Sequence, residues 1–226
     1  MSKKKKILIG IMILIVVSII GLVIFFAFSN KGEKEVGAEN SSQYDSSYTM
    51  PYYIKVNHEA QVVSIYTQDE NGYHTVPYKA MICSTGTKTP KKGVYRLPEK
   101  AEKPSRARWI ALEGSVWGQY GTRITEGILF HSVPCDKQTA SSLRWDDYDK
   151  LGEEASKGCI RLTVIDAKWI YENCMPGTKV EFYASSDPGP LGKPVAQKIS
   201  DEFEILKRWD PTDPNEENPW HKVEEK

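Results

Sequence analysis

The sequence contains one cysteine and one histidine whose surroundings suit covalent catalysis. Cys159 follows Gly158 and opens onto an Ile-Arg-Leu run. A nucleophile on a tight turn needs a small neighbour so that substrate can approach the backbone, and Gly158 meets that need. His131 ends the apolar run 128–130, so we expect the packing of a strand to fix its ring. A thiol paired with an imidazole is a common way to activate cysteine near neutral pH.

The residues around Cys159 would support such a reaction. Lys157 and Arg161 are cations, which favour the reactive thiolate. Backbone N–H groups of residues 157–159 would stabilise a developing oxyanion, usually a large electrostatic contribution in acyl transfer. The ordinary alternatives are a buried apolar cysteine in a turn and a hydrogen-bonded core histidine. The other histidines lie in turn-like segments or near the C-terminus: His58, His74 and His221.

Composition narrows the possible functions. The formal net charge is zero and the pI is about 6.9, which argues against nucleic-acid binding. The chain has no Cys-x-x-Cys or His-x-x-x-His spacing, so the sequence gives little support for a structural zinc site. It has four cysteines, and if Cys159 is a free nucleophile at least one of the other three is unpaired within the chain.

A membrane anchor is predicted near the N-terminus. The run from Ile7 to Phe28 has 22 residues without charge, which is long enough to cross a bilayer as a helix. Lysines at positions 3–6 precede it, so the positive-inside rule places the rest of the chain outside the cytoplasm. A cleaved signal peptide is the alternative, because Ala27 and Ser29 are small, but its apolar region is normally about 7–15 residues long. We therefore expect a single-pass membrane protein, with residues 1–6 as its cytoplasmic tail.

The remaining chain is predicted to form one mostly β domain between two polar segments. Residues 29–50 have the Ser-, Glu-, Asn- and Gly-rich composition of a flexible stalk. Within the domain, 51–184, Thr163 and Asp166 mark the start of a helix that stops at Pro176, and a shorter helix is possible within 141–151. Residues 185–226 are expected to be an extended acidic and Pro-rich tail with local docking points. Strands are predicted at 52–57, 61–67, 78–84, 93–97, 107–112, 116–120, 127–132 and 179–184.

Two blocks of residues occur in a characteristic order. One is His131-Ser132 followed by Ser156-x-Gly158-Cys159-Ile160-Arg161-Leu162, and the other, upstream, is Ser84-Thr85-Gly86 followed by Thr89-Pro90-x-x-Gly93-Val94-Tyr95. Together they resemble the L,D-transpeptidase family, cysteine enzymes that cross-link peptidoglycan. The resemblance covers about residues 52–183. It implies a β-sandwich or barrel with one or two short helices, here preceded by the transmembrane helix.

The resemblance also implies a mechanism. His131, oriented by Ser132, would take the proton of Cys159, and the thiolate would attack a peptidoglycan stem tetrapeptide before its terminal D-alanine. Attack on the acyl-enzyme by a neighbouring stem's amine would give a 3–3 cross-link, whereas water would make the protein an L,D-carboxypeptidase. Carbapenems would acylate the cysteine, and no metal or cofactor is required. The residues expected to shape the nucleophile turn and contact the oxyanion or a substrate carboxylate are Ser156, Lys157, Gly158 and Arg161.

The chain departs from the family pattern at two places. Lys157 stands where relatives often have histidine, and the step of 28 positions from His131 to Cys159 implies an insertion around residues 137–155. We expect the insertion, with Trp145 and several acidic residues, to be a lid. Two other hypotheses are a papain-like wall endopeptidase, in which the cysteine usually precedes the histidine, and a non-catalytic wall-binding module of the same fold. The third stem residue, diaminopimelate or lysine, stays open.

Overall fold

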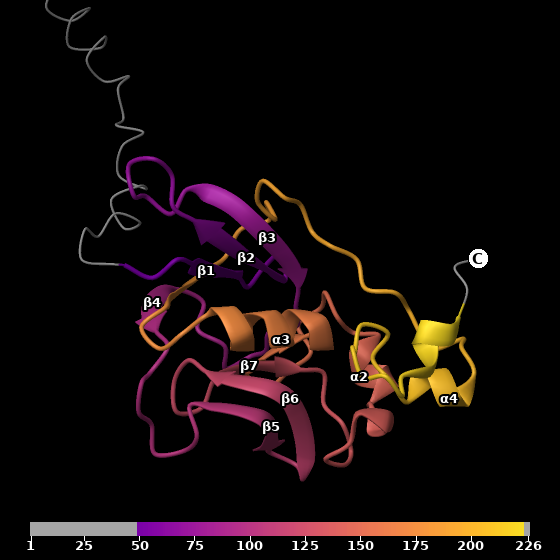
Figure 1. The fold of residues 1–226 in the computed structure, drawn as a ribbon. Coiled ribbons are helices and arrows are strands. Elements are labelled where there is room, and N and C mark those ends of the chain that lie inside the picture. The colour runs from indigo at the N-terminus through magenta and orange to yellow at the C-terminus, as the bar shows by residue number, and fades with distance from the viewer. Residues whose placement is uncertain (1–48, 224–226) are drawn as a thin grey trace, which may run out of the picture. The chain divides into compact units, whose positions relative to one another are not determined.

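The computed structural model describes residues 49–223, which form two β-sheets (Figure 1). The larger sheet has the strand order β3-β2-β1-β9-β4 and the smaller one β5-β6-β7-β8. The strands of the larger sheet are β1 Tyr53–Asn57, β2 Val62–Thr67, β3 Val76–Ile82, β4 Gly93–Arg96 and β9 Lys179–Tyr183. Those of the smaller sheet are β5 Arg106–Leu112, β6 Val116–Arg123, β7 Leu129–Ser132 and β8 Ile160–Leu162.

Both sheets are mixed, and each contains one parallel pair. β1 runs parallel to β9, and β7 runs parallel to β8, whereas the other neighbours are antiparallel. Parallel strands need a crossover connection, so these pairs join segments that are distant in sequence and cannot form as local hairpins. The β-branched and aromatic residues that predicted the strands line one core, whose fully buried members include Val56, Phe130, Ile160 and Phe182.

Helix α3, Val164–Asn173, packs against β6, β7 and β8 directly after the predicted nucleophile segment (Figure 1). Its start was predicted correctly: the Thr163 side chain accepts a hydrogen bond from the Asp166 backbone N–H, as a capping residue does. Ala167 and Ile170 are fully buried in the core, so the helix holds the end of β8 in place.

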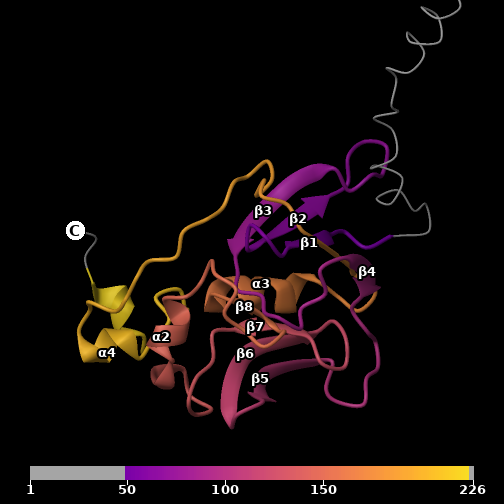
Figure 2. The same cartoon turned by 180° about the vertical axis from the view of Figure 1, so that it is seen from behind.

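A second hydrophobic cluster joins the insertion to the C-terminal segment. Its short helices are η1 Ala140–Ser142 and α2 Trp145–Tyr148 from the insertion, and α4 Glu204–Lys207 and η2 Pro219–Lys222 from the C-terminal segment. Figure 2 shows α2 and α4 side by side, and the cluster buries Tyr148 against Ile199, Trp209 and Trp220. The Asp149 carboxylate accepts hydrogen bonds from the backbone N–H groups of Ile199 and Ser200 at 2.9 and 3.0 Å.

The mostly β fold with few helices agrees with the prediction, and all eight predicted strands are present within a few residues. β8 was not predicted, because a strand of three residues is too short to show an alternating pattern. The predicted membrane helix and most of the stalk lie outside the described residues. Among residues 49–223 no helix is long and apolar enough to span a membrane.

Candidate active site

The parallel pair β7–β8 brings together the segments that contain the predicted nucleophile and the predicted base. Phe130 is opposite Ile160 and His131 is opposite Arg161, so Cys159 lies just before the paired residues. Side chains alternate between the two faces of a strand. Those of His131 and Arg161, which are opposite each other, therefore project from one face, and Cys159 immediately precedes β8 although 28 positions separate it from the histidine in sequence.

The ring of His131 is buried and held in one orientation. Its Nδ1 lies 2.6 Å from the Ser132 carbonyl oxygen, and since a carbonyl only accepts, Nδ1 carries the proton. The Nε2 lone pair is then left to accept a proton from a nucleophile. Gly118 on β6 makes room for this ring, because a Cβ at that position would lie 3.0 Å from His131 Cβ and Nδ1.

His131 is neutral at rest. Burial and, to a smaller extent, the nearby Arg161 cation lower the pKa of its imidazole to about 4, against the opposing effect of the Ser132 carbonyl. Ser132 is itself fully buried, and its hydroxyl accepts from the Gln119 backbone N–H and donates to the Val133 carbonyl, both at 2.9 Å. The Ser132 hydroxyl thus adds a hydrogen bond between β7, the strand of His131, and β6.

The Cys159 thiol is half-buried between two backbone groups of one neighbouring segment. Sγ donates to the Gly127 carbonyl at 3.8 Å, and the Leu129 backbone N–H is placed to stabilise a thiolate. Burial raises the pKa of the thiol, while the Leu129 N–H, Arg123 and Arg161 act in the opposite direction. Cys159 is therefore a neutral thiol and His131 a neutral imidazole at rest.

Three successive carbonyl groups of the nucleophile turn are fixed by hydrogen bonds. The Lys88 N–H donates to Lys157 O at 3.0 Å, the Thr89 hydroxyl donates to Gly158 O at 2.6 Å, and the Ser156 hydroxyl donates to Cys159 O at 2.6 Å. In a trans peptide the C=O and the following N–H point in opposite directions. The N–H groups of Gly158 and Cys159 are consequently directed away from the 88–89 segment, where they can act as donors to an oxyanion.

The upstream sequence block wraps around this turn. The Thr89 hydroxyl accepts from the Gly86 N–H at 2.8 Å while it donates to Gly158 O, and the Thr85 carbonyl accepts from the N–H groups of Ala155 and Ser156 at 3.0 Å. A Cβ at Gly86 would overlap the Ser156 carbonyl, so only glycine fits. The two blocks that carry the family resemblance therefore form one structural unit.

The two predicted site cations, Lys157 and Arg161, each pair with an acidic residue. The Lys157 ammonium group is exposed and lies 2.8 Å from Glu113 Oε1 in the β5–β6 turn. Arg161 Nη1 lies 2.8 Å from Asp147 Oδ1 of the insertion. Sequence analysis did not identify Gly118 or Gly127 as site residues and placed Asp147 only among the acidic residues of the insertion, because their proximity depends on pairing between distant segments.

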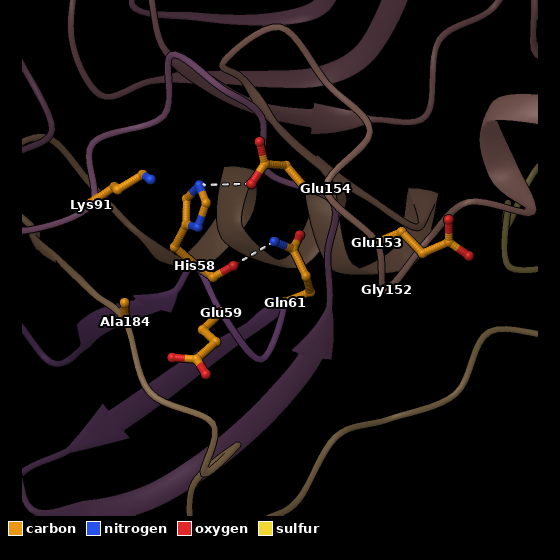
Figure 3. A pocket seen from close by; sticks show the side chains of 8 residues that line it. All are labelled: His58, Glu59, Gln61, Lys91, Gly152, Glu153, Glu154 and Ala184. Atoms are coloured by element: carbon orange, nitrogen blue, oxygen red, sulfur yellow. Dashed lines mark hydrogen bonds and ion pairs between the residues drawn. The ribbon is translucent and has the colours of Figure 1, made fainter.

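A hollow of about 490 Å³ lies beside the unit that supports the nucleophile turn (Figure 3). His58 and Gln61 line it from the β1–β2 turn, and Glu154 lines it from the segment before Ser156. His58 Nε2 lies 3.5 Å from Glu154 Oε2, and Gln61 Nε2 donates to Thr85 Oγ1 at 2.7 Å. Neither Cys159 nor His131 contributes to the walls of this hollow, so it is separate from the thiol–imidazole pair.

Comparison with known proteins shows the family to which the chain belongs. The family model YkuD, the L,D-transpeptidase catalytic domain, matches residues 51–182. The chain belongs to this family.

The matching proteins include a curated relative and several solved structures. The putative L,D-transpeptidase YciB of Bacillus subtilis (strain 168) is 33% identical over 136 residues, which cover 57% of this chain and 63% of the relative. The matched region thus spans less than two thirds of that protein. An L,D-transpeptidase from Mycobacterium smegmatis is 16% identical, with a TM-score of 0.44 and 59% of each chain covered. L,D-transpeptidase 3 from Mycobacterium tuberculosis, in complex with a faropenem-derived adduct, is 21% identical, with a TM-score of 0.41 over 59% of this chain and 60% of that one.

Proposed function

We propose that the protein is a peptidoglycan L,D-transpeptidase that works through a Cys159 thioester. The observation that supports this proposal is the β7–β8 pair, which joins the strand that Cys159 immediately precedes to the strand of a buried His131 whose Nδ1 proton is fixed by the Ser132 carbonyl. Membership of the L,D-transpeptidase catalytic domain family supports the substrate class.

The proposed reaction has two acyl transfers. His131 Nε2 takes the thiol proton as Sγ attacks the carbonyl between the third stem residue and the terminal D-alanine. The tetrahedral intermediate collapses, the C–N bond breaks, and the imidazolium returns the proton to the D-alanine amine. The amine of a neighbouring stem then attacks the thioester and loses a proton to His131, so that the cross-link forms and the thiol is restored.

The nucleophile turn supplies the electrostatic contribution. The N–H groups of Gly158 and Cys159 would bind the oxyanion, and removing such a donor typically costs about 3 kcal/mol of transition-state stabilisation. Ser156 holds the turn through the Cys159 carbonyl. The Lys157 ammonium group pairs with the exposed Glu113 carboxylate.

We also propose that residues 7–28 anchor the protein in the cell membrane with the domain outside the cytoplasm. The uncharged run of 22 residues and the lysines before it support this topology. Protease added to intact cells should then digest the domain and leave a small membrane-embedded N-terminal fragment. Recovery of the domain in the cytosolic fraction would contradict the topology.

The enzymatic proposal can be tested with the detergent-solubilised full-length protein. Incubation with a carbapenem should add one inhibitor mass, because its strained β-lactam carbonyl acylates the thiol, and the adduct should be absent in Cys159→Ala. A disaccharide-tetrapeptide should yield a cross-linked dimer and free D-alanine. Free D-alanine with only tripeptide product would identify a carboxypeptidase, and wall binding without adduct or turnover would identify a binding module.

A further inference from the structure

Asp147, in the helix α2 of the insertion, makes a buried ion pair with the active-site strand β8. Its Oδ1 lies 2.8 Å from Arg161 Nη1, and its Oδ2 lies 3.4 Å from Arg144 Nε. The side chains of Asp147 and Arg161 are only 11% and 16% exposed. Each carboxylate oxygen of Asp147 therefore has an arginine partner. The Arg161 guanidinium is directed toward Asp147 and not toward solvent.

Arg161 is close enough to the reacting groups for its position to matter. It is the register partner of His131 and lies two residues after Cys159. Its charge acts on the imidazole and on the thiol. The other charged group acting on the thiol is Arg123 of β6, whereas Lys157 and Glu113 pair with each other at the surface.

We propose that Asp147 is a positioning residue of the acyl-transfer site, which holds the Arg161 guanidinium beside Cys159 and His131 and neutralises its charge there. The inference rests on the proposed function. It gives the insertion a role other than that of a lid: α2 supplies the counter-ion of the active-site arginine. The second hydrophobic cluster and the Asp149 hydrogen bonds hold α2 in place for this purpose.

Loss of the carboxylate would have two opposite chemical effects. An arginine left buried without its counter-ion is free to change position, and misplacement of active-site groups by about 1 Å typically lowers rates by about 100-fold. The unneutralised cation would also favour the thiolate and disfavour the imidazolium. Simple alkylation of Cys159 should therefore become faster at neutral pH, while acyl transfer, which needs the imidazole as a base, becomes slower.

Asp147→Asn in the full-length protein tests this inference, with Asp146→Asn as the matched control. Asp146 is the preceding residue of the same helix and is exposed. In Asp147→Asn we expect acylation by the carbapenem to fall about 10- to 100-fold. The pH profile for alkylation of Cys159 should move to lower pH, with a single cysteine modified. Asp147→Glu should restore most of the acylation, and the control should match wild type in both assays.

A double-mutant cycle separates positioning from a general loss of structure. If Asp147 acts through Arg161, Asp147→Asn should not change the alkylation profile further in an Arg161→Gln background. Modification of all four cysteines in Asp147→Asn, or an unshifted profile with one cysteine modified, would overturn the inference. A wild-type protein that fails to react with the carbapenem or the tetrapeptide would instead refute the proposed function, since the alkylation arm does not depend on it.

Discussion

At the residue scale, burial sets the protonation states of the site. The imidazole of His131 has its pKa lowered to about 4, and the thiol of Cys159 has its pKa raised, so neither group is charged at rest near neutral pH. The three remaining cysteines are free, fully buried and still less acidic: burial raises the pKa of Cys135 and Cys174 to about 12, and that of Cys83 also rises.

Alkylation of the native protein should therefore be selective and depend on pH. We expect iodoacetamide to modify Cys159 alone, with a rate that rises about tenfold per pH unit between pH 6 and pH 8, because the thiolate fraction rises in that proportion below the pKa. Peptide mapping identifies the modified residue, and Cys159→Ala is the control. A rate that stays constant across this range would instead indicate a preformed thiolate–imidazolium pair.

At the scale of elements, the active site depends on contacts between segments that are distant in sequence. Thr89 and Gly158 are 69 positions apart, yet the Thr89 hydroxyl fixes the turn that presents Cys159. The short loop before β4 thus shapes the entrance to β8. The buried Thr89 hydroxyl connects two loops, because it accepts from the Gly86 N–H of its own loop and donates to Gly158 O of the nucleophile turn.

Thr89→Val should remove this connection with little change in side-chain shape. We expect the free energy of unfolding to fall by about 1–3 kcal/mol, because the Gly158 carbonyl and the Gly86 N–H lose a buried partner. Acylation of Cys159 should slow as well, since the turn is no longer fixed. Thr89→Ser keeps the hydroxyl and should stay near wild type in urea unfolding and in acylation. Equal behaviour of the two variants would show that the hydroxyl is not important.

The sequence predicted local features well and long-range contacts poorly. The strand runs and the cap at Thr163 were visible because alternation and capping are properties of neighbouring residues. Cys159 and His131 were identified from their order in a resembling signature, but the pairing of their segments follows from the β7–β8 register. The partners of Lys157 and Arg161 are Glu113 and Asp147, which no spacing rule connects to them.

At the scale of the whole described domain, the C-terminal segment is tied to the catalytic sheet. The Asp210 carboxylate accepts from the Val164 N–H at the start of α3, and Asp213 accepts from the Gln119 side chain, both at 2.8 Å. The Gln119 backbone in turn donates to Ser132, the residue that orients His131. A segment predicted as a tail with local docking points is thus connected to His131 through two hydrogen-bonded residues, Gln119 and Ser132.

Asp210 gives this segment a measurable pH dependence. Burial raises the pKa of its carboxyl group to about 6, above the ordinary value of 3.8. The folded state therefore binds the proton more tightly, and this contribution to stability is present below pH 4 and lost as the pH rises through 6. Relative to Asp210→Asn, the wild-type unfolding free energy should fall by up to about 3 kcal/mol over that range.

Urea unfolding at several pH values checks this expectation. The exposed Asp201, also in the C-terminal segment, provides the control variant Asp201→Asn, whose pH dependence should follow that of wild type. Parallel curves for wild type and Asp210→Asn would show that Asp210 does not titrate differently in the folded state.

The parallel pairing of β1 with β9 has a consequence for folding kinetics. Tyr53 pairs with Lys179 and Asn57 with Tyr183, so the larger sheet joins strands that are more than a hundred residues apart. Such non-local contacts slow folding, because the entropy of closing a long loop must be lost before the contacts form. The β1–β2–β3 meander can form early, but its β1 edge stays open until β9 has been synthesised. During that interval the chain presents an unpaired strand edge, which is the state in which a partly made domain is most prone to aggregate.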